Sequence, residues 1–158
     1  MAGFAEVEVD VETGKCDLLD YVAVADVGTV IHPRALGGQV LGRSMLGMGH
    51  AMNQKTVYDQ HYGVALARGC YQNRPPTILD VPANMQWAAV EICLIPKHRS
   101  VRAASANRRS APGCCAILNA LSDALGDDIF RRAPVTLDTV LTSLEQGKPV
   151  QETLTAHI

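Results

Sequence analysis

A strict alternation of apolar and acidic residues near the start of the chain constrains its fold more than any other feature. In residues 4–11, the apolar Phe4, Val7, Val9 and Val11 are interleaved with the acidic Glu6, Glu8 and Asp10, and the turn-forming residues 12–15, Glu-Thr-Gly-Lys, follow directly. An alternation with a period of two predicts a half-buried β-strand, and the turn predicts that the chain reverses into a hairpin. The return strand is predicted over residues 16–27, which are rich in Leu, Tyr and Val.

The hydrophobic spacing changes to a helical period after this hairpin. Apolar residues recur at four, three and four positions in Leu41, Met45, Met48 and Met52. This spacing predicts a helix over residues 34–54 with its methionine stripe in the core. Glycine is unusually frequent there, at positions 37, 38, 42, 47 and 49. Because an interior glycine costs about 1 kcal/mol relative to alanine, we expect the close approach of a backbone or a bulky ligand on the stripe of Gln39, Gly42, Leu46 and Gly49.

The remaining elements mix strands and helices without a regular alternation. Strands are predicted at residues 56–59 and 87–95, with a loop at 68–84 between them. A helix at residues 114–125 is predicted to end at Gly126, and a last helix is predicted between a Thr136 cap and Gly147. The residues expected to face inward on the last helix are Leu137, Val140, Leu141 and Leu144. We therefore expect an α+β fold.

Composition limits the class of protein. With 158 residues, 47% of them hydrophobic, and a formal net charge of -2, the chain suits one medium domain and not a disordered polyelectrolyte. It contains no apolar run of about 20 residues, and acids stand where a secretory signal would be positive, so we expect a cytoplasmic protein. Five cysteines without a C-x-x-C pair, and five histidines without an i, i+4 pair, predict neither a disulfide scaffold nor a metal site.

Residues 92–122 form a basic island in this acidic chain. The span contains no Asp or Glu but holds five of the fourteen Lys and Arg residues, namely Lys97, Arg99, Arg102, Arg108 and Arg109. Nucleic-acid binding is one interpretation, but the run at residues 103–106, Ala-Ala-Ser-Ala, interrupts the basic residues and no aromatic side chain is available for base stacking. A solvated loop is the favoured interpretation, so a nucleic-acid partner is not expected.

Several segments together resemble the large, molybdopterin-binding subunit of the xanthine dehydrogenase and aldehyde oxidase family. The resemblance covers nearly the whole chain and lies in the order and spacing of the motifs. They comprise residues 4–10, 12–14, 21–24, 26–28, 31–33 (Ile-His-Pro), 38–42 (Gly-Gln-Val-Leu-Gly), 47–49, 58–59, 116–120 and 132–136.

The resemblance implies the second half of a molybdenum-cofactor-binding domain. It implies a partial domain over residues 1–147, with an aberrant basic loop at 94–113 and a C-terminal tail at 148–158. Gln39, with Gly38 and Gly42, matches the glutamine motif that contacts the cofactor in the family. The family hydroxylates an aldehyde or N-heterocycle carbon with oxygen from water, using molybdenum-molybdopterin, and iron-sulfur and flavin (FAD) partner subunits carry the electrons away.

The family's general base, a glutamate in a Gly-Glu-Pro-Pro turn, has no counterpart here, because Asn107 occupies the expected position. An amide cannot accept a proton near neutral pH, so no catalytic residue is assigned. If residues 94–113 are written in GC-rich codons and read from the third base, they spell the family loop, which suggests a compensated frameshift between about Cys93 and Gly113. We expect a fragment that is inactive alone. The alternatives are a basic-loop binding module and a structural half-subunit that acts in trans with a missing N-terminal half.

Overall fold

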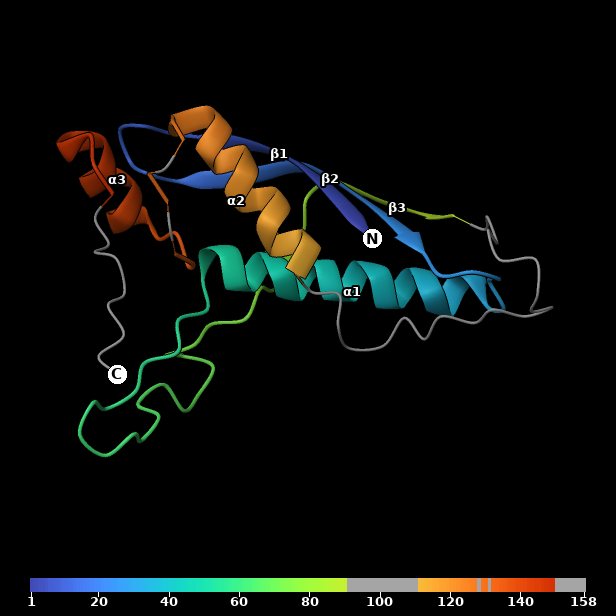
Figure 1. Ribbon diagram of the computed structural model, residues 1–158, viewed down its shortest axis with the longest axis horizontal. Helices are drawn as coiled ribbons and strands as arrows, with labels where there is room; N and C mark the ends of the chain where they lie inside the picture. Colours follow the sequence, from blue (N-terminus) through green and yellow to red (C-terminus); the bar gives the residue numbers. More distant parts are fainter. Residues whose placement is uncertain (91–110, 128, 131, 150–158) are drawn as a thin grey trace, which may run out of the picture.

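In the part of the chain that the structure describes, a three-stranded sheet and three helices form the α+β fold that the sequence predicts. The computed structural model describes residues 1–90, 111–127, 129–130 and 132–149. The elements are β1 (Ala2–Val9), β2 (Cys16–Asp26), α1 (Pro33–Met52), a 3-10 turn (Ile78–Asp80), β3 (Asn84–Val90), α2 (Ala111–Leu125) and α3 (Leu137–Gln146) (Figure 1). The strand order is β1-β2-β3. β1 and β2 are antiparallel, whereas β2 and β3 are parallel.

The predicted hairpin is confirmed, and the Asp10 carboxylate organises its turn. Asp10 accepts hydrogen bonds from the Glu12 backbone N–H at 2.9 Å and from the Thr13 hydroxyl at 2.7 Å. Gly14 adopts a φ of 72°, which favours glycine. Phe4 lies on the same face as the glutamates and is 64% exposed, because a two-residue period separates even from odd positions in β1.

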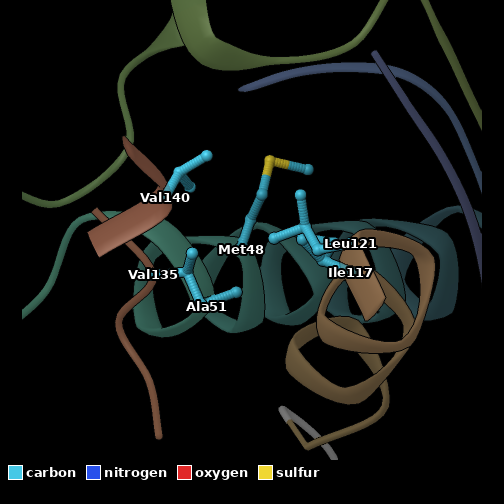
Figure 2. Packing of buried hydrophobic residues seen from close by; sticks show 6 residues of the cluster. All are labelled: Met48, Ala51, Ile117, Leu121, Val135 and Val140. Atoms are coloured by element: carbon cyan, nitrogen blue, oxygen red, sulfur yellow. The ribbon is translucent and has the colours of Figure 1, made fainter. Parts of the chain in front are cut away.

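Two apolar clusters join the helices to one face of the sheet. The first contains Met48, Ala51, Ile117, Leu121, Val135 and Val140 (Figure 2). The second contains Tyr21, Ala23, Ala25, Val27 and Val40, with Trp87 packed against them. The expected methionine stripe of α1 is confirmed, since Met48 is buried while Met45 and Met52 pack against the first cluster. α1 and α2 therefore cover the same face of the sheet.

Close packing explains some of the glycines. A Cβ at Gly37 would lie 2.6 Å from the Trp87 indole, and one at Gly49 would lie 2.6 Å from Pro76 Cδ. In α2, a Cβ at Gly113 would lie 2.8 Å from the Ser44 carbonyl oxygen. Contacts this short are not compatible with a side chain. Gly37 and Gly49 thus allow Trp87 of β3 and Pro76 of the following loop to approach α1 closely. Gly113 allows α2 to approach the backbone of α1.

Three expectations need correction or restriction. Residues 56–59 are not a strand, since among the described residues Tyr58 forms only an isolated bridge with Ala65. Leu137 is 54% exposed and does not face inward, because it is the first residue of α3. The strand expected at 87–95 is β3, and residues 91–95 lie outside the described residues.

The ends of the last two helices agree with the prediction. Gly126 follows α2 with a φ of 118°, and Gly147 ends α3 in the left-handed region at 59°. Thr136 is the N-cap residue of α3, but its hydroxyl contacts the Asp138 carboxylate and not a backbone N–H. The hydrogen bond from Thr136 lowers the pKa of Asp138, which lies at the positive end of the helix.

Replacement of Tyr21 by phenylalanine tests an unusual feature of the second cluster. Tyr21 is fully buried, and its hydroxyl has no hydrogen-bond partner among the described residues. Burying a hydroxyl that forms no hydrogen bond costs desolvation free energy that no interaction offsets. Tyr21→Phe should therefore leave the free energy of unfolding unchanged or raise it by up to about 1 kcal/mol. Urea unfolding followed by circular dichroism measures the change. A loss larger than about 1 kcal/mol would show that the hydroxyl does have a partner.

Candidate functional site

Local interactions fix the start of α1, the helix that carries the predicted cofactor residues. His32 is the N-cap, and its Nδ1 accepts a hydrogen bond from the Ala35 backbone N–H at 3.0 Å. Pro33 follows at the first helical position, where its missing N–H has no cost and its φ suits the helix. No acidic residue lies in the first turn of α1. The position of the next turns, including residues 38–42, therefore follows from this cap.

The candidate site is an open stripe on α1 formed by Gly38, Gln39, Gly42 and Leu46. All four residues are exposed, and Leu46 is 46% exposed. Gly38 and Gly42 are four positions apart and lie on the same side of the helix. A Cβ added at either position would meet nothing within 4 Å. The stripe thus presents nearly bare backbone beside the amide of Gln39, which can both donate and accept hydrogen bonds.

The glycines of α1 fall into two groups that the sequence does not separate. Gly37 and Gly49 are required by their neighbours, Trp87 and Pro76. Gly38 and Gly42 have no such neighbour, although an interior glycine costs about 1 kcal/mol relative to alanine. The packing of the described residues does not explain these two, so they remain the positions where another molecule or chain segment can approach the helix.

A cleft of about 570 Å³ lies at the other end of α1. Four separate segments form its walls: the start of β2, the end of α1, the loop at 74–81 and the start of α3. Several of its charged groups pair with one another. Lys15 Nζ lies 2.5 Å from an Asp17 carboxylate oxygen, and Arg74 lies 3.5 Å from Asp80. Each of these ion pairs neutralises a cation that would otherwise face the cleft alone.

Two titratable groups of the cleft, Cys16 and Asp80, have pKa values displaced by their surroundings. Burial raises the pKa of the Cys16 thiol, so it remains protonated and weakly nucleophilic. Hydrogen bonds from the Thr77 backbone N–H and hydroxyl lower the pKa of Asp80, whose ionised carboxylate thereby closes the capping box of the 3-10 turn. Among the described residues, no group of three or more His, Cys, Asp or Glu side chains could hold a metal ion.

The residues predicted from sequence are partly brought together. Gln39, Gly42 and Leu46 share one exposed stripe with Gly38, whereas Gly49, which the spacing also placed on the stripe, is buried against Pro76. Asn107 and the five basic residues of the island lie outside the described residues. Sequence reasoning missed the cleft, because its walls come from four distant segments and no periodicity links them. Of the helices in the described ranges, none is long and apolar enough to cross a bilayer.

Comparison with known proteins places the chain in a family of cofactor-binding proteins. Residues 1–82 match the family model for the molybdopterin cofactor-binding domain, and the stripe on α1 lies within this match. The chain is 32% identical over 149 residues to the probable hypoxanthine oxidase XdhD of Escherichia coli K12, covering 92% of this chain. It is also 27% identical over 146 residues to PaoC, the molybdenum-binding subunit of an aldehyde oxidoreductase of Escherichia coli K12, covering 89% of this chain and 19% of PaoC.

The fold has a close counterpart among solved structures. Quinoline 2-oxidoreductase from Pseudomonas putida 86 superposes with a TM-score of 0.74 at 24% identity, covering 89% of this chain and 18% of that one. The chain belongs to the molybdopterin-binding xanthine dehydrogenase and aldehyde oxidase family of molybdenum-cofactor oxidoreductases. The family resemblance, the α+β fold and the molybdopterin cofactor expected from the sequence are thereby confirmed. The chain spans 15% of the length of XdhD.

Proposed function

We propose that this chain contributes the α1 stripe to a molybdopterin site as part of a molybdenum hydroxylase large subunit. The observation that carries the proposal is the open space beside Gly38 and Gly42. Two glycines that destabilise a helix without a packing reason are expected where a ligand must touch the backbone. The match of residues 1–82 to a molybdopterin cofactor-binding domain supports the same assignment.

The residues present suit one edge of such a site. The Gln39 amide is exposed and can hydrogen-bond to polar atoms of a pterin, while Gly38 and Gly42 leave room for the bulk of the ligand. When bound, the group would supply the two-electron oxidation that incorporates oxygen from water at an aldehyde or N-heterocycle carbon. This chain's own contribution is to bind and orient the cofactor through α1, whose N-terminus is fixed by the His32 cap.

We further propose that the chain is a fragment and is inactive alone. Asn107 occupies the position where the family carries its glutamate, and its amide cannot take up a proton near neutral pH. General-base assistance is commonly worth a factor of about 10² to 10⁴ in rate. A frameshift across residues 94–113 accounts for the loss, and the nucleotide sequence tests it directly: codons that cannot spell the family loop exclude it.

The partners proposed for the chain are an iron-sulfur subunit, a flavin subunit, or the missing N-terminal half of the molybdenum-binding subunit supplied in trans. Two relatives carry names that make them components of larger enzymes, one of a nicotinate dehydrogenase from Pseudomonas putida and the other, PaoC, of an aldehyde oxidoreductase. The proposed organisation is a partial domain over residues 1–147 followed by the tail at 148–158. The substrate, an aldehyde or N-heterocycle, and the cytoplasmic location stay predictions from the sequence.

The cofactor proposal is tested by the metal and pterin content of the purified chain. The chain is produced in a host that makes the cofactor, molybdenum is measured by mass spectrometry, and the pterin by fluorescence after oxidation. We expect Gln39→Ala and the double change Gly38→Ala with Gly42→Ala to lower both contents. The double variant should nevertheless be more stable than the parent by up to about 2 kcal/mol, because each alanine gains helix propensity.

The matched control is Asn119→Ala, which lies at an exposed position on α2 away from the stripe. It should also raise stability by a few tenths of a kcal/mol, but it should leave molybdenum and pterin content unchanged. Equal cofactor content in the parent and in all three stripe substitutions would contradict the assignment of Gly38, Gln39 and Gly42. A parent chain without cofactor would contradict cofactor binding by this chain alone.

A further inference from the structure

Trp87 stands among small residues on the face of the sheet that α1 covers. In the parallel register of β2 and β3 it lies beside Ala23, and Ala25 lies beside Ala89 in the next inward row. Ala23 and Ala25 are at most 1% exposed, and Val40 of α1 belongs to the same cluster. Alanine side chains fill little of the layer between sheet and helix. The half-buried indole is therefore the bulky group that separates this part of the sheet from α1.

The indole meets α1 at a position where the helix has no side chain. Gly37 is buried near the start of α1, and a Cβ built there would lie 2.6 Å from both Nε1 and Cε2 of Trp87 and 2.8 Å from its Cζ2. The flat ring therefore rests directly on the helix backbone, which only glycine permits at this distance. Figure 1 shows β3, the strand of Trp87, running along the N-terminal part of α1. The indole thus sets the distance between the sheet and this part of the helix.

The proposed cofactor stripe begins at the residue that follows Gly37. Gly38 and Gln39 are exposed on α1, whereas Gly37 is buried toward the sheet. Because these residues share one turn of a hydrogen-bonded helix, an outward shift of Gly37 carries Gly38 and Gln39 with it. The His32 cap fixes where α1 begins, but it does not set how far the helix lies from the sheet. The contact between Trp87 and Gly37 sets that distance.

We propose that Trp87 is a positioning residue for the cofactor stripe and that it acts through Gly37. The proposal rests on the proposed function, because it requires that Gly38, Gln39 and Gly42 meet the cofactor. Groups that bind a ligand must be held within about 0.5 Å of their productive positions. A methyl group at position 37 exceeds this tolerance, since a 2.6 Å contact must open toward 3.4 Å, where ordinary van der Waals contact begins.

The test exchanges bulk between the two contacting positions and follows the molybdenum and pterin content of the purified chain. Gly37→Ala should lower both contents about tenfold, a loss that is common when a group behind a ligating residue is disturbed. Trp87→Phe should also lower them, because the shorter ring leaves a gap beneath Gly37. The double variant should recover much of the cofactor content of the parent, because the added methyl group fills the space that the shorter ring leaves.

The matched control is Gly49→Ala at the other end of the same helix. Its Cβ would lie 2.6 Å from Pro76 Cδ, which is as short as the contact at Gly37. With a rise of about 1.5 Å per residue, Gly49 lies about 18 Å along α1 from Gly37. Gly49→Ala should therefore lower the free energy of unfolding in urea much as Gly37→Ala does, while its cofactor content stays at the level of the parent. This comparison separates positioning of the stripe from a general loss of stability.

Circular dichroism establishes which variants are folded, and Trp87→Phe tests the proposal even if Gly37→Ala does not fold, because it introduces no clash. In a parent that carries cofactor, three results overturn the positioning role: equal cofactor loss in Gly37→Ala and Gly49→Ala, full content in folded Trp87→Phe, or a double variant no better than Gly37→Ala. The proposed function stands in each of these cases. A parent chain without cofactor contradicts cofactor binding by this chain alone and the positioning role together.

Discussion

Replacing Leu121 by alanine is expected to lower the free energy of unfolding by about 2–5 kcal/mol. Leu121 lies on α2, is fully buried, and belongs to the cluster in which Met48 of α1 and Ile117 also lie (Figure 2). Truncation leaves a cavity where the two helices meet the sheet, and the surroundings relax only in part. Since domains of this size are stable by only about 5–15 kcal/mol, this one change removes a large share of the total.

Urea unfolding measured by circular dichroism checks this expectation. The matched control is Leu137→Ala, which makes the same chemical change at a residue that is 54% exposed. The control should change the free energy of unfolding by no more than about 0.5 kcal/mol. Equal losses at positions 121 and 137 would mean that α2 does not pack against α1 as described.

A second large effect is expected from Gly113→Ala, which we predict to destabilise the chain by about 1–3 kcal/mol. The added Cβ would lie 2.8 Å from the Ser44 carbonyl oxygen and 3.3 Å from the Ser44 Cα, both of them backbone atoms of α1. Backbone atoms cannot rotate away as a flexible side chain can, so the two helices must separate. The disruption should therefore exceed the gain in helix propensity.

Gly42→Ala is the control for this prediction and should have the opposite sign. A Cβ at Gly42 meets nothing within 4 Å, so the change gains about 1 kcal/mol of helix propensity without a clash. Urea unfolding can be followed by the fluorescence of Trp87, the single tryptophan. If Gly113→Ala proves as stabilising as Gly42→Ala, the close crossing of α1 and α2 is contradicted.

Much of the fold was predictable where local signals suffice. The hairpin follows from alternation and a glycine turn, and α1 and α3 follow from helical spacing with a proline or glycine at their ends. Residues 56–59 show the limit of such signals, because Val57 and Tyr58 favour a strand but meet only a short partner segment. The parallel pairing of β2 with β3 joins segments far apart in the chain, and no local pattern encodes it.

The candidate site was predictable only in part for a similar reason. Spacing placed Gln39 and Gly42 on one stripe, and the family resemblance added Gly38. Sequence alone did not show which glycines of α1 are needed for packing, because Trp87 and Pro76 approach the helix from distant segments. Of the two glycines on the predicted stripe, Gly49 is closely approached, by Pro76, whereas Gly42 has no neighbour among the described residues, so that close approach there stays a prediction. Gly37, which lies outside that stripe, is also closely approached, by Trp87.

The parallel register of β2 and β3 also has a consequence for the order of folding. β1 and β2 are joined by a short turn, so they can pair early at a small entropic penalty for loop closure. β3 can join only after residues 27–83, including α1, have come together across the sheet. High contact order slows such a step. We expect the last strand to dock late, once the crossover segment has become ordered.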